Sequence, residues 1–417
     1  MNTPLPLNRF TSQALARALF KSEVPESLVR SLPAQSLYMA IKHNGLPSSI
    51  EILELTTLEQ ARLMLDLDCW SHDTFSEEHF WEWLSVCNSH SDLSLMQRLL
   101  KSMDLKLAAL LMARHVSYVH FEEATDEPPG PAWYTPDKGK TWIHILIEHK
   151  EQHFLLGRFL ALVYESDADL FYQLLAISQA ESQSSLEERA YEDKCKRVIS
   201  HGIPDAEYAG EVNAPLSSQT ILAELQKGEK HPRVHDISSI EPLLYDGGLL
   251  QPLASLFSYP ELRDDLELEM TLLMNAGIVR YGVDFSEQQQ VLELAARVKG
   301  ALNIGLEVTL GLCERPVKEI YDVLGLRKIY GLGLTQLFEL RKLSRILRNR
   351  LQDRCDDDQP LQVMLETTSS PLPCQPAFFK VDGSFEEYDG KLATGQRAIE
   401  SLAEIEALKQ YLLRVEQ

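Results

Sequence analysis

Apolar residues recur at helical spacing along most of this chain, in short segments separated by breaks that contain proline, glycine, serine or threonine. The pattern covers about residues 11–115, resumes near Glu148, and dominates again over about residues 240–354. Each such segment predicts an amphipathic helix that buries one face against a neighbour. We therefore expect a mainly α-helical protein whose short helices pack into an irregular, solenoid-like array.

Two four-residue segments carry the signature of a helix start. Residues 57–60 and 74–77 each place a hydroxyl three positions before an amide or a carboxylate. In a capping box these two side chains bond opposing backbone N–H groups, so we expect helices to begin at Thr57 and Thr74. Another helix is expected from Ser286 onward, and Gly305 falls on its apolar face, which fits close packing of a second helix.

One stretch interrupts the helical pattern. Residues 116–121 and 141–145 are rich in β-branched and aromatic side chains, and the loop between them contains proline and glycine. Such runs around a turn predict two paired strands, so we expect a small β-hairpin insertion. The triplet Gly139-Lys140-Thr141 is similar to part of a phosphate-binding loop, but Tyr134 stands where that motif needs a glycine, and a strand pattern follows it.

The last part of the chain combines a linker-like composition with a helical pattern. Residues 356–389 are acidic and rich in proline and serine, and apolar residues at helical spacing follow from Ile399 to Leu412. We expect a closing amphipathic C-terminal helix. The predicted parts of the chain are an N-terminal helical array (1–115), the β-hairpin insertion (116–147), middle helices with a loop (148–236), a second helical region (237–354), and an acidic linker with the C-terminal helix (355–417).

The negative net charge of the chain limits the kinds of partner that it can bind. Lysine and arginine total 40 against 62 for aspartate and glutamate, which gives a formal net charge of −22. Nucleic acids and anionic membrane surfaces attract clustered cations, so we expect neither as a partner. With 44% hydrophobic and 24% charged residues, the composition is that of a folded globular protein.

Cysteine placement and the first residues favour a cytoplasmic location. The six cysteines lie far apart and form no Cys-x-x-Cys pair, so we expect reduced thiols. The residues after Met1 lack the apolar core of a signal peptide. The most apolar segment, residues 154–164, is too short to span a bilayer.

Histidines are densest between positions 144 and 153. His149 and His153 are four apart and would share one helix face, as zinc ligands do, with His144 nearby. The spacing departs from the metalloprotease motif, because Glu151 lies one position too late. A metal held by His149, His153 and a distant carboxylate is the alternative interpretation. We favour a solvated helix face and expect no bound metal, nucleotide or other cofactor.

Three tryptophans, Trp70, Trp81 and Trp83, lie close together in the sequence, beside His72 and other polar residues. Tryptophans anchor protein interfaces and also fill protein cores. Core packing is the favoured interpretation, and a groove that receives a partner is the alternative.

Positive charge gathers on one predicted helix of this acidic chain, where Arg341, Arg345 and Arg348 share a stripe. We favour pairing of these side chains with the acidic stretch at residues 353–358. An anionic ligand or an acidic partner surface is the alternative, because guanidinium groups bind carboxylate and phosphate in a bidentate geometry.

Several short segments have distinctive sequences. They are "QARLMLDLDCW" at residues 60–70, the Trp81-Glu82-Trp83-Leu84 segment, "YTPD" at residues 134–137 and "LNIGLE" at residues 302–307. In these stretches the chain resembles an uncharacterised bacterial family, domain of unknown function 6178. The resemblance covers most of the chain from Ser31 to about Arg350 and implies no activity, cofactor or catalytic residue.

The sequence contains no complete catalytic, cofactor-binding or nucleic-acid-binding motif. We expect a protein-interaction or scaffold protein, because stacked helices expose long concave surfaces that suit protein partners. The alternative is an enzyme or metal-binding protein whose site is assembled from distant residues around His144, His149 and His153.

Overall fold

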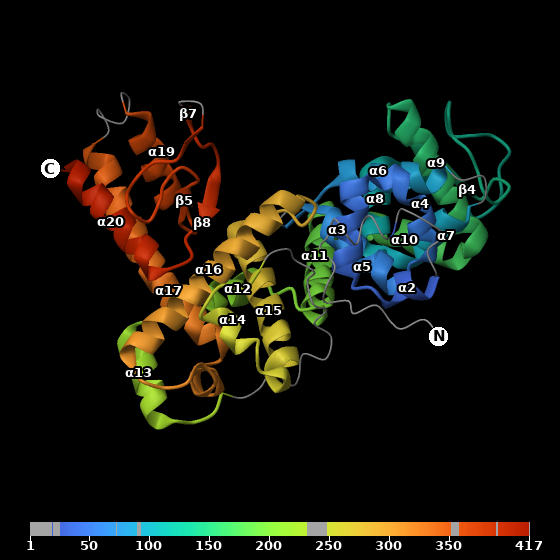
Figure 1. Ribbon diagram of the computed structural model, residues 1–417. Coiled ribbons are helices and arrows are strands. Elements are labelled where there is room, and N and C mark those ends of the chain that lie inside the picture. The colour runs from blue at the N-terminus through green and yellow to red at the C-terminus, as the bar shows by residue number, and fades with distance from the viewer. Residues whose placement is uncertain are drawn as a thin grey trace. The chain divides into compact units, whose positions relative to one another are not determined.

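The computed structural model describes Leu19 and residues 26–71, 73–89, 93–231, 248–351, 358–388 and 391–416. Over these ranges the chain is mainly α-helical, with small antiparallel strand pairs and a C-terminal helix (Figure 1). The predicted fold class is confirmed. The chain divides into two compact units, and the boundary between Val198 and Ile199 falls inside the predicted part 148–236.

The first unit consists of helices that follow one another closely along the chain. They are α2 (Glu26–Ser31), α3 (Ala34–Asn44), η2 (Leu46–Ser49), α4 (Ile50–Leu55), α5 (Leu58–Asp68), α6 (Glu77–Asn88), α7 (Ser94–Ser102), α8 (Leu105–His115), α9 (Lys150–Ser166), α10 (Ala168–Ala180) and α11 (Gln183–Ser200), which ends just past the boundary. Helix α5 packs on α3 and α7, while α10 packs on α8 and α9. The largest fully buried side chains here include Tyr38, Phe80, Phe159 and Phe171, which form the core of this unit.

The two predicted capping boxes have different outcomes. At the start of α5, Gln60 N–H donates to Thr57 Oγ1 over 3.0 Å and Thr57 N–H donates to Gln60 Oε1 over 2.8 Å, so this prediction is confirmed. The prediction at Thr74 is wrong. Strand β2 (Thr74–Phe75) pairs there with β1 (Trp70–Ser71), and α6 starts later, with Ser76 as its N-cap.

Long-range contacts explain why a strand replaces the predicted helix start at Thr74. The Phe75 N–H donates to Glu187 Oε1 over 2.8 Å, and the Phe75 ring contacts the Trp70 ring edge to face. These contacts hold residues 74–75 in an extended conformation, which the local four-residue pattern does not encode.

The predicted hairpin is present as β3 (Val116–His120) and β4 (Thr141–Ile145). The strands are antiparallel, with Val116 opposite Ile145 and His120 opposite Thr141. In the turn, Gly139 has a φ of +94°, and a Cβ atom there would lie 2.2 Å from the Thr125 carbonyl oxygen. The Gly139-Lys140-Thr141 triplet therefore leads into a strand through a tight backbone contact, and not into the helix that a phosphate-binding loop requires.

The second unit is built around two long helices, α16 (Gln288–Leu312) and α17 (Val317–Arg350), which pack along each other (Figure 1). Its other elements are α12 (Ala206–Val212), α13 (Ser218–Lys227), α14 (Leu253–Leu256), η3 (Pro260–Leu262), α15 (Arg263–Tyr281), α19 (Gln359–Thr368), α20 (Leu402–Glu416), and the strand pairs β5 (Cys374–Pro376) with β8 (Gln396–Ala398) and β6 (Glu387–Tyr388) with β7 (Lys391–Leu392). Within the described ranges, no helix is long and apolar enough to cross a membrane.

Glycines permit the close approach of α16 and α17. A Cβ atom on Gly305 would lie 2.0 Å from the Ile329 carbonyl oxygen, and one on Gly333 would lie 1.8 Å from the Ala301 carbonyl oxygen. Any side chain at these positions would push the two helices apart. The predicted packing role of Gly305 is confirmed.

The predicted acidic linker is wrong for its described residues, 358–388. They contain α19 and β5, and Met364, Leu365, Cys374 and Phe379 are all buried. Helix α19 packs on α17, and β8 packs on α16. Regularly spaced apolar residues within this stretch provide a buried face, which outweighs its acidic, proline-rich composition.

Candidate functional site

The three predicted tryptophans lie in the core of the first unit. Trp70, Trp81 and Trp83 are 9%, 8% and 3% exposed, so they do not line an open groove. The Trp83 indole N–H donates to the buried carboxylate of Asp68 over 2.6 Å, and the Trp81 ring lies against the His115 ring. Their neighbour His72 lies outside the described residues.

The predicted histidines lie at the hairpin and the helix that follows it. His144 is in β4 and stacks on Trp133, with ring centroids 5.4 Å apart. His149 precedes α9 and His153 lies in its first turn, and both side chains are exposed. Over the ranges that the structure describes, no group of three histidine, cysteine, aspartate or glutamate residues is arranged to hold a metal ion.

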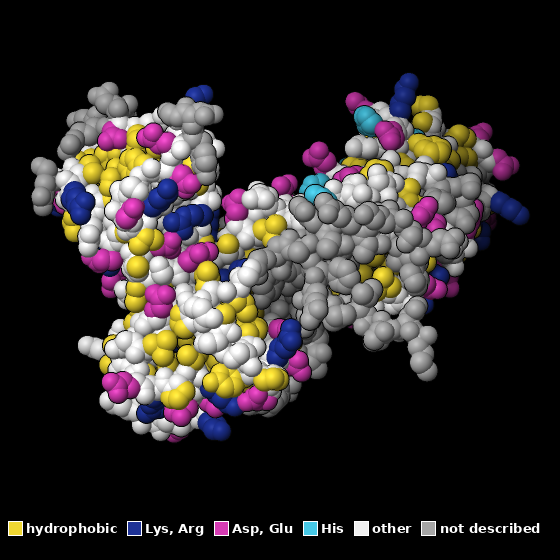
Figure 2. Space-filling view, in the orientation of Figure 1, with side chains coloured by type: hydrophobic (Ala, Val, Ile, Leu, Met, Phe, Trp, Pro, Cys, Tyr) yellow, Lys and Arg dark blue, Asp and Glu magenta, His cyan; other side chains and the backbone are white. Residues whose placement is uncertain are grey.

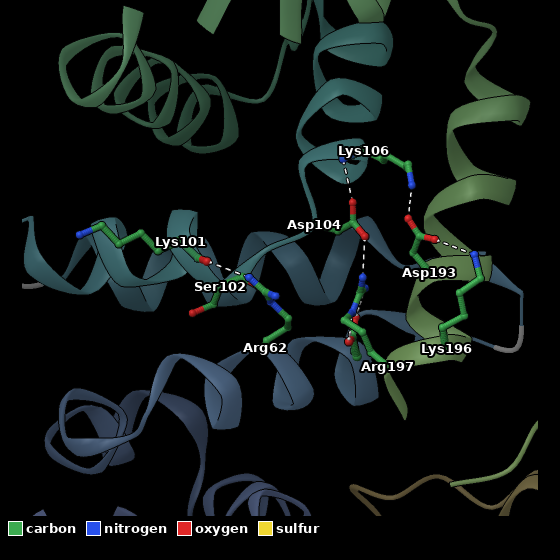
Figure 3. Close-up of polar contacts among 9 residues, drawn as sticks. Arg62, Lys101, Ser102, Asp104, Lys106, Asp193, Lys196 and Arg197 are labelled. Atoms are coloured by element: carbon green, nitrogen blue, oxygen red, sulfur yellow. Dashed lines mark hydrogen bonds and ion pairs between the residues drawn. The ribbon is translucent and has the colours of Figure 1, made fainter. Parts of the chain in front are cut away.

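Charged residues of the first unit form a network around Arg197 of α11 (Figure 3). Its guanidinium donates two bonds of 2.8 Å to Asp66 of α5 and one of 2.7 Å to Asp104, the N-cap of α8. Nearby, Asp193 of α11 pairs with Lys106 and with Lys196, the latter over 3.1 Å (Figure 3). Each of the three guanidinium nitrogens of Arg197 thus donates to a carboxylate.

The titration behaviour of this network reflects its pairing. Burial raises the pKa of Asp66, and the hydrogen bonds from Arg197 oppose this rise. Hydrogen bonds from Lys106 and Lys196 lower the pKa of Asp193 to about 2. The cavity beside Asp66 has a volume of only about 10 Å³, which is room for one water molecule at most. We interpret this network as a structural connection of α11 to α5 and α8.

The second unit contains a much larger cavity, of about 400 Å³. It lies among the end of α12, the end of α15, the middle of α17 and the segment after α19. Its lining residues are Gly210, Asn213, Ala214, Pro215, Arg280, Tyr281, Phe338, Arg341 and Pro371. One of them, Arg341, belongs to the predicted basic stripe.

The Arg341 side chain is held in a defined orientation beside this cavity. Its Nη1 donates to the Pro371 carbonyl oxygen over 2.6 Å, and its guanidinium carbon lies 4.2 Å from the centroid of the Phe338 ring. The ring covers one face of the guanidinium through a cation–π contact. The carbonyl bond uses one donor group, so the remaining N–H groups stay available for a ligand.

Positive charge around the cavity has no carboxylate partner among the described residues. Arg280 lies in the last turn of α15, and neither its side chain nor that of Arg341 forms an ion pair with a described aspartate or glutamate. Burial lowers the pKa of Arg341, and the charges of Arg345 and Arg280 lower it further. Bringing these cations together costs electrostatic free energy that a bound anion would recover.

The other two arginines of the predicted basic stripe are not among the described residues that line the cavity. Arg345 and Arg348 are exposed on α17, and no described carboxylate pairs with either. Most of the predicted acidic stretch, residues 353–358, lies outside the described residues. Its described member, Asp358, caps α19 by accepting from the Leu361 N–H over 3.1 Å. The pairing between the stripe and this stretch stays a prediction.

The sequence did not indicate Arg280 as a candidate. It is an isolated cation at a helix end, far from Arg341 along the chain, and an arginine in a last helical turn is common because it complements the helix dipole. Only the packing of α15 near α17 places both residues at one cavity.

Acidic side chains are scattered over the visible described surface, with lysines and arginines interspersed (Figure 2). Against this background, a cavity whose described lining residues include two arginines and no acidic residue is a local exception to the charge of the chain. It is the candidate functional site.

The model of a family of unknown function, DUF6178, matches residues 7–417 of the chain. The chain belongs to this family, and the resemblance predicted from its sequence is confirmed. No curated protein and no solved structure matches the chain.

Proposed function

We propose that this member of the DUF6178 family is a binding protein, and that the arginine-lined cavity of its second unit receives the anionic group of a ligand. One observation carries the proposal: Arg280 and Arg341 line a cavity of about 400 Å³, and its described lining residues include no aspartate or glutamate. In a chain with 62 acidic and 40 basic side chains, cations without a described acidic partner are unexpected.

The geometry suits an anion of small-molecule size. Guanidinium groups bind carboxylate and phosphate through paired, charge-assisted hydrogen bonds. Arg341 is already oriented by Phe338 and by the Pro371 carbonyl, so little side-chain entropy would be lost on binding. Pro215 and Ala214 add apolar surface, which gives the mixed lining typical of small-molecule sites.

Each arginine also has a structural explanation. Arg280 complements the C-terminal end of α15, a contribution of about 0.3–1 kcal/mol, and Arg341 connects α17 to the segment at Pro371. These explanations account for one contact of each residue. They do not account for a cavity that both arginines line and whose described lining residues include no carboxylate.

The two functions expected from the sequence differ in the support that the structure gives them. The scaffold role stays a prediction, and the anion cavity supplies a specific site for a binding protein. The enzymatic or metal-binding alternative around His144, His149 and His153 receives no support from the described residues, where no carboxylate joins these histidines.

Calorimetric titration of the full chain with inorganic phosphate, acetate and lactate tests the proposal. We expect the wild type to bind at least one of these anions. Replacing either Arg280 or Arg341 with glutamine should weaken binding about 10-fold or more, because a hydrogen bond to a charged group contributes about 1.5–3 kcal/mol. Arg348→Gln is the matched control, since Arg348 is exposed on the same helix away from the cavity.

The proposal is wrong if the wild type binds none of the anions. It is equally wrong if Arg280→Gln and Arg341→Gln bind as tightly as the Arg348→Gln control. Thermal melting of each variant establishes that it is folded when the titration is made.

A further inference from the structure

The long helix α17 is interrupted at Gly325. This residue has a φ of +64° and a ψ of 169°, a backbone conformation that is open almost only to glycine. Helical hydrogen bonds that span such a residue cannot form. In an unbroken helix the Leu326 N–H would donate to the Asp322 carbonyl oxygen, and the interruption separates this donor from this acceptor.

Two other segments of the second unit replace the lost bond, one at each of its ends. The Leu326 N–H donates to Glu269 Oε2 of α15 over 2.6 Å. The Asp322 carbonyl oxygen accepts from the His231 N–H over 2.7 Å. Both groups of the broken bond therefore have partners from outside α17, which offsets the free energy that unpaired buried backbone groups would cost.

Glu269 holds the bend from both sides. One of its carboxyl oxygens accepts from the Tyr321 hydroxyl, before Gly325, over 2.7 Å, and the other accepts from Leu326, after Gly325. Its side chain is buried, and burial raises its pKa, while the bonds from Tyr321 and Leu326 oppose this rise. Burying a carboxyl group costs free energy, and these two bonds from α17 offset that cost.

The bend lies at the base of the helical segment that leads to the arginine-lined cavity. Arg341 follows Gly325 in α17, and Arg280 follows Glu269 in α15. Arg341 is 15 residues beyond Leu326, which is about 22 Å along a helix. A change of about 10° at the bend would therefore move Arg341 by about 4 Å, a shift larger than a hydrogen bond tolerates.

We propose that Glu269 is a positioning residue for the anion site: by holding the bend of α17 at Gly325, it places Arg341 at the cavity that Arg280 also lines. This inference rests on the proposed anion-binding function. The bonds of Glu269 join the same two helices, α15 and α17, whose arginines line the cavity.

Helix packing offers a simpler explanation of the bend. A Cβ atom on Gly333 would lie 1.8 Å from the Ala301 carbonyl oxygen, so the second half of α17 is also held closely against α16. Packing explains the course of the helix, yet it requires no carboxyl group at the bend. It also predicts a different result: loss of the Glu269 carboxyl group would then lower stability and leave anion affinity unchanged.

Calorimetric titration of the full chain with inorganic phosphate and acetate tests the inference in two variants of Glu269. Glu269→Met removes both strong acceptors at similar length, and it should weaken binding about 10-fold, the effect of one lost hydrogen bond to a charged group. Glu269→Gln is the conservative partner. Its amide oxygen can still accept from Leu326 while the Tyr321 hydroxyl turns to accept from the amide nitrogen, so it should bind within about 3-fold of the wild type.

Gly325→Ala tests the bend itself. The positive φ disfavours any residue with a side chain, and the alanine Cβ would lie 2.5 Å from His231 Cδ2. The variant should therefore favour an unbroken helix and weaken anion binding as Glu269→Met does. Gly311→Ala is the matched control, because a Cβ atom at this position of α16 meets no other atom within 4 Å. It should bind as the wild type does.

A double variant separates positioning from general damage to the cavity. If Glu269 acts through Arg341, then Glu269→Met should cause no further loss of affinity in the Arg341→Gln protein. Equal losses in the wild-type and Arg341→Gln backgrounds would overturn the inference. Wild-type affinity in both Glu269→Met and Gly325→Ala would overturn it as well, and Gly325→Ala provides the same test if Glu269→Met is poorly folded.

The failure of this inference is distinguishable from that of the proposed function. The anion site stands without a role for Glu269 if Arg280→Gln and Arg341→Gln weaken binding while Glu269→Met and Gly325→Ala do not. A wild type that binds neither anion, or binding that both arginine variants leave intact, would overturn the proposed function and this inference with it.

Discussion

Arg197 in the first unit and Arg341 in the second unit are both partly buried and both oriented by their surroundings, yet their electrostatic environments are opposite. Two carboxylates surround Arg197. Burial lowers the pKa of Arg197, but the hydrogen bonds and charges of the two carboxylates outweigh this effect and raise the pKa. Arg341 donates to a carbonyl and stacks on a ring, and burial together with neighbouring cations lowers its pKa.

This difference distinguishes a structural cation from one that is available to a ligand. Around Arg197 the charges are neutralised within the fold and the adjacent cavity is almost filled. Around Arg341 the fold supplies orientation but no described counter-charge, and the adjacent cavity is large. Substitutions should therefore affect stability in the first region and ligand affinity in the second.

The largest expected effect is that of Arg197→Met on stability. Asp66, which is 4% exposed, would lose its partner, and removing one member of a buried ion pair costs about 3–5 kcal/mol. Protonation of Asp66 would recover part of this cost, since its pKa is already raised by burial. Urea denaturation measures the effect.

Arg189→Met is the control, because its pair with Glu181 is exposed and should contribute less than about 1 kcal/mol. Equal stability of the two variants would show that the Arg197 pairs contribute no more to the fold than the exposed pair of Arg189.

Arg341→Gln should show the opposite pattern. We expect anion affinity to fall about 10-fold or more, while the free energy of unfolding changes by about 1 kcal/mol or less, because only one bond to a carbonyl and one cation–π contact are lost. Titration and urea denaturation on the same sample measure both quantities. A large loss of stability with unchanged affinity would show that Arg341 is structural, as Arg197 is.

Gly210→Glu should place a carboxylate beside Arg341, so that its surroundings resemble those of Arg197. A Cβ atom on Gly210 meets no other atom within 4 Å, so a side chain fits, and Gly210 lines the cavity. The new carboxylate would pair with the arginines and compete with the ligand, while stability changes little or rises by up to about 1 kcal/mol. Gly210→Gln is the control for size. If both variants lose binding equally, bulk rather than charge is responsible.

The smallest expected effect concerns Asp193, at the exposed edge of the network around Arg197. The folded pKa of Asp193 is about 2, below its ordinary value of 3.8, so the folded state binds this proton less readily than the unfolded chain. Its stabilising contribution is therefore complete above about pH 4 and disappears as the pH falls through about 2. Asp193→Asn should be slightly less stable than the wild type at pH 6, with a difference that shrinks toward pH 2. A constant difference across this range would contradict the assignment.

The sequence by itself determined the features that depend on neighbours a few residues apart. Helical spacing of apolar residues indicated the mainly α-helical fold, the hydroxyl of Thr57 and the amide of Gln60 indicated one helix start, and Gly305 marked a close helix contact. The basic stripe also brought attention to Arg341. Each signal is local because backbone geometry repeats over a few residues.

Only the tertiary structure decided which charges are paired and which are free to bind. The same four-residue pattern forms a cap at Thr57 and a strand at Thr74, because Glu187, more than a hundred positions away, accepts from the Phe75 N–H. Arg280 and Arg341 meet at one cavity, while Arg197 meets Asp66 and Asp104, through the packing of separate helices. Hydrogen bonds and ion pairs act over a few ångströms in space, whatever the separation along the chain, and leave no periodic pattern in the sequence.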